Sequence, residues 1–222
     1  MTGGAREDDA GTGDGSDDDV ATGDEREADG TNAAETVAWP VALSGVTETV
    51  VTTLGPNDRW NAAALGVFAG DPVTARTWGN TRTRRNFHRR GEGFVQFVDD
   101  PVTFTDAALS IHEVDEPVLE SASAWVRVAV SPIDSGSEDG TEWETWTLEP
   151  VETAVVAERV PTIDRGFSAV VEATVAASRL GVEGYDDAHL RDRLEYCASV
   201  VERAGGPRER TALERVREHA EW

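Results

Sequence analysis

The sequence predicts a mainly β domain with some helix, of the barrel or sandwich type, followed by a C-terminal segment of three helices. From Val46 to about Val156, apolar and polar residues mostly alternate with the period of two that is typical of β-strands. After Pro161 the apolar residues recur at helical spacing instead. The first 36 residues lack the apolar side chains that a core requires, so the folded part is expected to begin near Val37.

The N-terminal segment, residues 1–36, contains twelve acidic residues and two arginines, and therefore contributes −10 to the formal net charge of −23 of this 222-residue chain. A segment of this composition cannot bury enough apolar surface to offset the conformational entropy that it would lose on ordering. We therefore expect a disordered acidic segment over residues 1–36, a barrel domain over residues 37–158 and a helical segment over residues 159–222.

Several short strands are expected in the first domain, and turn residues separate them. One early helix interrupts these strands. It is expected to begin near Asn80 or Thr81 and to end at Gly91, which suits the C-terminal cap of a helix. The expected strands lie in the sequences TETVVTTLG, RWNAAALGVFAG, GFVQFVDD, AWVRVAVSP and EWETWTLEPVETAVV.

The helical segment contains two stripes of mostly apolar residues at helical spacing. Asp186 or Asp187 can cap the second helix, and the pair Gly206-Pro207 opens a third helix that continues to Trp222. About sixty residues in three helices form only a small core, so we expect them to pack against the barrel or a second subunit. The stripes consist of Phe167, Val170, Val171, Thr174 and Ser178, and of Leu190, Leu194, Cys197 and Val201.

Composition excludes several classes of chemistry. All twenty basic residues are arginine, so Schiff-base lysines and P-loop lysines are excluded, and with them pyridoxal-phosphate enzymes and ordinary Walker-type NTPases. The single cysteine, Cys197, excludes an intrachain disulfide and a Cys-rich metal site. His112 has no second histidine at metal-ligand spacing, and no G-x-S-x-G motif supports a nucleophile, so we expect no metal and assign no catalytic residue.

The balance of charges predicts the environment of the protein rather than its partners. Abundant acid, absent lysine and much Ala, Val and Gly are typical of haloarchaeal proteins, whose carboxylate surfaces stay hydrated in concentrated salt. The N-terminus lacks a basic region followed by an apolar run, and no apolar stretch approaches membrane-spanning length. We therefore expect a soluble, cytoplasmic protein.

The stretch from Ala75 to Gly93 departs from this acidity, because it holds six arginines and one glutamate. Three interpretations are open: a solvated basic face, a nucleic-acid contact, or a site for one small phosphate. Clustered arginines contact phosphates, but a chain of charge −23 repels a polyanion at low salt. A helix N-terminus offers unpaired N–H groups to a phosphate, and Thr81, Arg82 and Thr83 add two hydroxyls and a guanidinium. One small phosphate therefore fits best.

The preceding strand supplies features that suit the rest of a nucleotide. In the sequence WNAAALG, Asn61 stands before Ala62 and Ala63. Small side chains let a flat ring lie close to a strand backbone, whose amides can hydrogen-bond the polar edge of the ring. Asn86 can either secure the helix to a neighbouring loop or reach the ligand. Trp78, at a strand end just before the helix, suits both a packing role and a ligand wall.

These motifs resemble the FMN-binding split β-barrel of flavin-reductase-like proteins, which carries a Lys/Arg-x-Thr-x-x-Asn signature on this helix. The sequences VVTTLGPNDRWNAAALGV, DPVTARTWGNTRTRRNF and RGFSAVVEATVAASRL resemble more closely the archaeal family known as domain of unknown function 447. The resemblance implies FMN bound at a homodimer interface, with its phosphate near Thr81, Arg82 and Thr83. Its ring would lie along Asn61–Ala63, and Thr77 and Trp78 would line the pocket. Thr81 stands where lysine is frequent, so Arg82 supplies the charge.

Several functions are compatible with this resemblance. We expect a flavin-dependent oxidoreductase, in which a reduced nicotinamide or a deazaflavin passes hydride to the flavin and the flavin carries the reaction. The alternative is a flavin-binding protein without turnover, which serves storage or sensing. A deazaflavin could replace FMN, since related barrels use both. A nucleic-acid binder ranks third, so the expected partners are FMN, an electron donor and a second copy of the chain, without nucleic acid or membrane.

Overall fold

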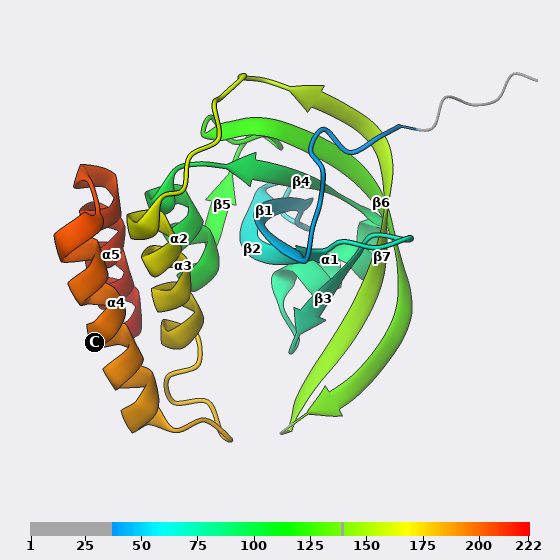
Figure 1. The fold of residues 1–222 in the computed structure, drawn as a ribbon. Helices are drawn as coiled ribbons and strands as arrows, with labels where there is room; N and C mark the ends of the chain where they lie inside the picture. The colour runs from blue at the N-terminus through cyan, green and yellow to red at the C-terminus, as the bar shows by residue number, and fades with distance from the viewer. Residues whose placement is uncertain (1–36, 139) are drawn as a thin grey trace, which may run out of the picture. The chain divides into compact units, whose positions relative to one another are not determined.

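The computed structural model describes residues 37–138 and 140–222, and the segment predicted to be disordered, residues 1–36, lies outside the described residues. No helix in the described ranges is long and apolar enough to cross a membrane. Figure 1 shows the strands curled into a barrel and the helices gathered beside it. In chain order the elements are β1 (Val46–Leu54), β2 (Trp60–Phe68), β3 (Thr74–Trp78), α1 (Arg82–Arg90), β4 (Glu92–Val98), α2 (Pro101–Leu109), β5 (His112–Val114), β6 (Ala122–Glu138), β7 (Thr141–Val155), α3 (Arg165–Ala177), α4 (Asp187–Ala204) and α5 (Pro207–Ala220).

The strands form one antiparallel sheet that closes on itself. The order is β1-β4-β6-β7-β3-β2, and β2 pairs back onto β1 along its whole length, while the short β5 lies outside the ring on β2. Closure pairs most of the strand edges within the ring. The chain is therefore a barrel, the first of the two alternatives that the strand pattern predicted.

Strand β2 has a neighbour on both sides near its ends but only on one side in its middle. Its first residues, Trp60–Ala62, pair with β5, and its last, Val67 and Phe68, pair with β3. Within the described ranges, residues 63–66 therefore have β1 as their sole strand partner. Strand β3 leaves β2 after Ala75 and continues along β7. The divergence of β2 and β3 splits the barrel wall.

Helix α1 packs beside the barrel core, and its boundaries agree with the sequence prediction. Thr81 is the N-cap and accepts a hydrogen bond from the backbone N–H of Arg84, at 3.3 Å. Gly91 ends the helix in the left-handed conformation, with φ of 67°, which a residue with a side chain rarely adopts. Phe87 is buried, and its ring centre lies 5.2 Å from that of Trp146. This contact fixes the helix to the core.

Helix α2 and strand β5 were not predicted, because the region around them was interpreted as strands and turns. Strand β4 ends at Val98, and Asp100 then caps α2 by accepting a hydrogen bond from the N–H of Thr103, at 3.1 Å. Pro101 occupies the first turn, where its missing N–H leaves no helical bond unmade. The pair Asp100-Pro101 is a helix-start signal that the alternating pattern of the preceding strand obscured.

The three C-terminal helices begin where the sequence predicted, and they reach the barrel through α2. Asp186 caps α4, and both predicted stripes are largely buried, although Ser178 is exposed at the C-cap of α3. Phe104 of α2 belongs to the same apolar cluster as Val50 and Ala62 of the barrel, and its ring centre lies 6.1 Å from that of Phe167 of α3. Helix α2 thus joins the barrel core to the helical core.

An ion pair fixes the same junction at its edge. Arg208 of α5 donates to the carboxylate of Asp100, with 2.8 Å between Nε and Oδ1. Burial acts to raise the pKa of Asp100, but hydrogen bonds from Arg208 and Thr103 outweigh it and hold that pKa below its usual range. The pair therefore links the start of α2 to the helical segment.

Candidate functional site

A hollow of about 240 Å³ lies at the split between β2 and β3, and we name it the split hollow. Its walls come from the middle of β2, the end of β3, the start of α1 and the end of α2. It thus forms where β2 lacks an outer strand partner, so the backbone amides of residues 63–66 that face the gap are open to a ligand. The lining residues are Ala63, Ala64, Leu65, Arg76, Thr77, Trp78, Thr81, Thr83, Ala107 and Ala108.

Two threonines bring the start of α1 to this hollow. Thr83 is only 4 % exposed, yet its hydroxyl has no hydrogen-bond partner among the described residues. Thr81 lines the same hollow from the N-cap position. The first N–H groups of a helix have no partner inside the helix and carry the positive end of its dipole. The split hollow therefore combines hydroxyls, free N–H groups and small apolar side chains.

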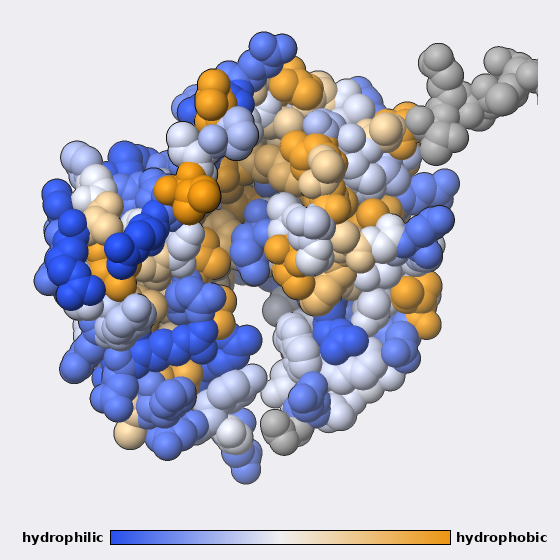
Figure 2. All heavy atoms as spheres, in the orientation of Figure 1, coloured by the Kyte–Doolittle hydropathy of each residue, from blue (hydrophilic) through white to orange (hydrophobic). Residues whose placement is uncertain are grey.

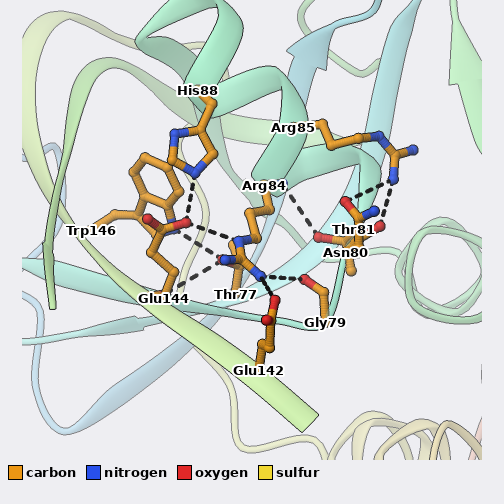
Figure 3. A network of polar contacts seen from close by, with 10 residues as sticks. All are labelled: Thr77, Gly79, Asn80, Thr81, Arg84, Arg85, His88, Glu142, Glu144 and Trp146. Carbon is orange, nitrogen blue, oxygen red and sulfur yellow. Dashed lines mark hydrogen bonds and ion pairs between the residues drawn. The ribbon is translucent and has the colours of Figure 1, made fainter. Parts of the chain in front are cut away.

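A polar network behind the hollow holds Thr77 in place (Figure 3). The hydroxyl of Thr77 accepts a hydrogen bond from Nε1 of Trp146, at 3.0 Å, and donates to the backbone carbonyl of Glu144, at 3.4 Å. The carboxylate of Glu144 binds Nε of Arg84 at 2.9 Å and Nε2 of His88 at 2.8 Å. The hydrogen bond that Arg84 donates to Glu144 is the main cause of the raised pKa of Arg84. The network ties β3, β7 and α1 together.

The remaining predicted residues lie elsewhere. The side chain of Ala62 is buried in the cluster that contains Phe104. Asn61, Arg82 and Asn86 line a second hollow, of about 320 Å³, on another side of α1. Because three arginines line it, we name it the arginine hollow; its walls are Gly55, Pro56, Asn57, Asn61, Arg82, Arg85, Asn86, Arg89 and Glu113.

Asn86 has the first of the two roles that the sequence left open, which is to secure the helix to a neighbouring segment. Its Nδ2 donates to the hydroxyl of Thr53, at 3.0 Å, and its Oδ1 accepts from Arg89, at 2.8 Å. Asn86 therefore secures α1 to strand β1. Arg82 forms an ion pair with Glu113 of β5, a residue that sequence reasoning did not connect with it, because β5 was not predicted.

A third hollow, of about 530 Å³, lies between the barrel and the helical segment, and we name it the helix-side hollow. Trp78 and Thr81 line both it and the split hollow, so the two hollows adjoin there. Arg179 and Tyr185 line the opposite wall, with the guanidinium 5.5 Å from the ring centre. Figure 2 shows the surface hollowed between the helices and the barrel. Trp78, which is 43 % exposed, forms a wall between the two spaces.

Sequence reasoning missed several residues at these sites. Glu144 has no local signal, because it lies 60 residues from Arg84 in the chain. Ala107 and Ala108 reach the split hollow from a helix that was not predicted. Among residues 37–138 and 140–222, no group of three or more His, Cys, Asp or Glu side chains could hold a metal ion.

Several solved structures are similar to this chain, to different extents. An FMN-bound protein from Methanosarcina mazei, of the family DUF447, is 25% identical, covers 80% of this chain and 96% of its own, and superposes with a TM-score of 0.69. A putative flavin reductase with a split barrel domain from Shewanella frigidimarina is 14% identical, with 53% and 70% covered and a TM-score of 0.38. The styrene monooxygenase flavin reductase from Pseudomonas putida is 12% identical, with 50% and 79% covered and a TM-score of 0.37.

The family models cover most of the chain. The N-terminal domain of the protein of unknown function DUF447 matches residues 47–157, which contain nearly the whole barrel and all the residues that line the split hollow. The C-terminal DUF447 model matches residues 164–218, which contain α3, α4 and most of α5. The chain is a split β-barrel with a C-terminal helical segment, and it belongs to the DUF447 family.

Proposed function

We propose that this chain binds one FMN in the split hollow. The observation that carries the proposal is Thr83, a residue only 4 % exposed that lines the hollow and whose hydroxyl has no hydrogen-bond partner among the described residues. A phosphate at the start of α1 would accept hydrogen bonds from Thr83, Thr81 and the free N–H groups of the first turn. An FMN-bound member of the same family supports the choice of ligand.

The flavin ring would lie against the remaining walls. Ala63 and Ala64 leave room for a flat ring against β2, and the backbone groups at the split can bond its polar edge. The split hollow of about 240 Å³ is small for a whole cofactor, but the adjoining helix-side hollow of about 530 Å³ provides further space beyond Trp78. We place Arg82, which is paired with Glu113, as a nearby positive charge. Asn61 and Ala62 precede this wall on β2, where the strand pairs with both β1 and β5, and they would hold Ala63 in position.

The activity that we propose is flavin-dependent oxidation and reduction, with a reduced nicotinamide or a deazaflavin as the electron donor. Bound FMN would supply the two-electron chemistry. The protein side chains would orient the ring and exclude water: Trp78 covers it, and Thr77 is held in place by Trp146 and Glu144. Arg76 lines the split hollow, and its positive charge favours negative charge gained by the ring. The second reactant would approach through the helix-side hollow.

A cofactor spectrum tests the proposal. Protein purified in molar KCl should be yellow and should contain about one FMN per chain, as measured by absorbance after the flavin is released. A colourless protein that takes up neither FMN nor a deazaflavin would overturn the proposal. Anaerobic bleaching by NADH, NADPH or a reduced deazaflavin would support turnover. Reduction by dithionite alone would favour the second candidate, a flavin-binding protein without turnover.

We also propose that the chain forms a homodimer. Trp78 and Phe68 are large apolar residues, near the split of the barrel, and both are more than two-fifths exposed at 43 % and 42 %. Exposed apolar side chains on neighbouring strands suit a subunit contact. Light scattering on the eluting peak of a gel-filtration column should give twice the mass of 23.9 kDa, and a mass of one chain would contradict the dimer.

A further inference from the structure

We propose that the arginine hollow is a second binding site, separate from the flavin site, for a ligand that carries a phosphate or diphosphate group. The hollow is lined by Arg82, Arg85 and Arg89, which occupy one face of α1 at helical spacing, and by the amides of Asn61 and Asn86. That this site is separate from the flavin site rests on the function proposed above, whereas the binding of a phosphate group here does not.

The positive charge of this hollow is not cancelled. Glu113 is its one carboxylate, and that group already contacts two guanidiniums, those of Arg82 and Arg59. Arg85 donates to the backbone and side-chain oxygens of Asn80, and Arg89 donates to Asn86. Neither guanidinium is paired with a carboxylate in the described part of the chain. Two cations are therefore oriented by neutral groups, although acids outnumber arginines by 43 to 20 in the sequence.

Asn61 gives a second and independent indication of a ligand. It is 6 % exposed, it lines the hollow, and no hydrogen bond to its side-chain amide occurs among the described residues. Because the residue is otherwise buried, the hollow is the place from which a ligand or water can bond its amide. The amide faces the same space as the arginines. A phosphate oxygen can accept from both the carboxamide and a guanidinium fork.

The hollow is distinct from the split hollow in the residues that line it. No residue lines both, and α1 contributes Thr81 and Thr83 to one and the arginine face to the other. On β2, Asn61 and Ala63 are two residues apart, which corresponds to about 7 Å along a strand. An anion in the arginine hollow would thus lie beside the flavin site without occupying it.

Two sources of the same chemistry fit this site. One is free phosphate or diphosphate, and the other is the diphosphate of a dinucleotide. The probes that distinguish them are inorganic pyrophosphate and ADP-ribose, which carries a diphosphate but no ring that can be reduced. Both can be titrated calorimetrically into FMN-loaded protein at one fixed KCl concentration, and neither requires turnover as a readout.

The variants Arg85→Ala and Arg89→Ala test the site, and Arg90→Ala is the matched control. Arg90 follows on the same helix and loses the same charge, but it does not line the hollow. Pyrophosphate should bind FMN-loaded protein, with affinity lowered at least tenfold in each test variant and less than twofold in Arg90→Ala. Competition between ADP-ribose and pyrophosphate would assign the site to a dinucleotide, and binding of pyrophosphate alone would assign it to a free anion.

Other outcomes would overturn the proposal. Absence of binding by both probes would do so, and so would equal losses in Arg89→Ala and Arg90→Ala, which would indicate a general field effect. Competition between pyrophosphate and FMN would show that the hollow holds the phosphate of the flavin itself. Failure of the protein to bind FMN would be seen first in its absorbance, and pyrophosphate titration of the flavin-free protein would then still test the anion site.

Discussion

Helix α1 carries arginines on two of its sides, and these sides face different surroundings. On the side toward β7, Arg84 contacts the carboxylates of Glu142 and Glu144 at 3.1 and 2.9 Å. On the side toward the arginine hollow, Arg85 and Arg89 contact only asparagine oxygens and a backbone carbonyl among the described residues. The same residue type thus joins two elements on one side and leaves its charge available to a ligand on the other.

The difference shows that an arginine must be interpreted from what faces it. A guanidinium with a buried carboxylate partner has satisfied its charge, and its removal leaves the partner unpaired. A guanidinium held by neutral oxygens keeps its charge for another anion. The sequence TRTRRNFHRR does not distinguish the two cases, because the carboxylates that do so come from β7 and β5. Four substitutions test the comparison, in order of decreasing expected effect.

The largest effect is expected on the paired side. Glu144→Gln leaves Arg84 and His88 without the carboxylate that both contact, and Glu144 is only 9 % exposed. We expect the free energy of unfolding to fall by about 2–3 kcal/mol. Glu142→Gln is the matched control: it contacts the same Arg84 but is 71% exposed, so it should cost less than about 0.5 kcal/mol. Urea denaturation measures both free energies of unfolding. Equal losses would show that burial of the carboxylate does not decide how much its pair with Arg84 stabilises the fold.

The next effect concerns ligand rather than stability. Thr83→Val keeps the shape of the side chain but removes the hydroxyl that we propose to bind the phosphate. Loss of a hydrogen bond to a charged group should weaken FMN binding by about ten- to a hundredfold. Thr211→Val, an exposed substitution on α5, controls for the change of residue type. Fluorescence titration with FMN measures the affinity, and an unchanged affinity in Thr83→Val would place the phosphate elsewhere.

The ion pair of Asp100 with Arg208, an arginine outside α1, measures what a more exposed pair contributes. Asp100→Asn should cost about 1 kcal/mol near neutral pH, because a charged cap and an ion pair are weakened together. The pKa of Asp100 is held below its usual range in the folded chain, so the carboxylate stabilises the fold above about pH 4 and this contribution is lost as the pH falls further. The stability difference between wild type and variant should therefore shrink toward pH 3. A difference that grows there would contradict the sign.

The smallest effect is expected for Arg89→Ala on FMN affinity, which should change less than about twofold. Arg89 lies about 10 Å along the helix axis from Arg82, and in strong salt the field at that distance is largely screened. The unfolding free energy should also change by less than about 0.5 kcal/mol, since Arg89 has no carboxylate partner in the described ranges. A loss of FMN affinity as large as that of Thr83→Val would erase the distinction between the two hollows.

The sequence predicted the elements well where hydrophobic periodicity is strong. The long strands and the three C-terminal helices have clear spacing, and α1 has local caps at Thr81 and Gly91. Helix α2 was not predicted, because its first residues follow directly after a strand with alternating apolar and polar residues. Strand β5 is three residues long, which is too short for a period to show.

The candidate site was predictable only in part. Which residues line the split hollow and which line the arginine hollow depends on contacts between residues distant in the chain. Residue reasoning named Ala63, Trp78, Thr81 and Thr83, the resemblance to a known family added Thr77, and these five residues line one hollow. Asn61 and Arg82 line the arginine hollow instead, because β5 pairs with the start of β2 and brings Glu113 to Arg82. No local pattern carries that information.

Helix α2 limits how the barrel and the helical segment can be separated or substituted during evolution. Its Phe104 packs against both the barrel and α3, so no domain boundary separates the two parts without cutting through an apolar cluster. Recombination that moved the barrel into another chain would carry α2 with one apolar side newly exposed to water. Inheritance should therefore keep barrel and helices together, and changes at Phe104 should be accompanied by compensating changes at Phe167.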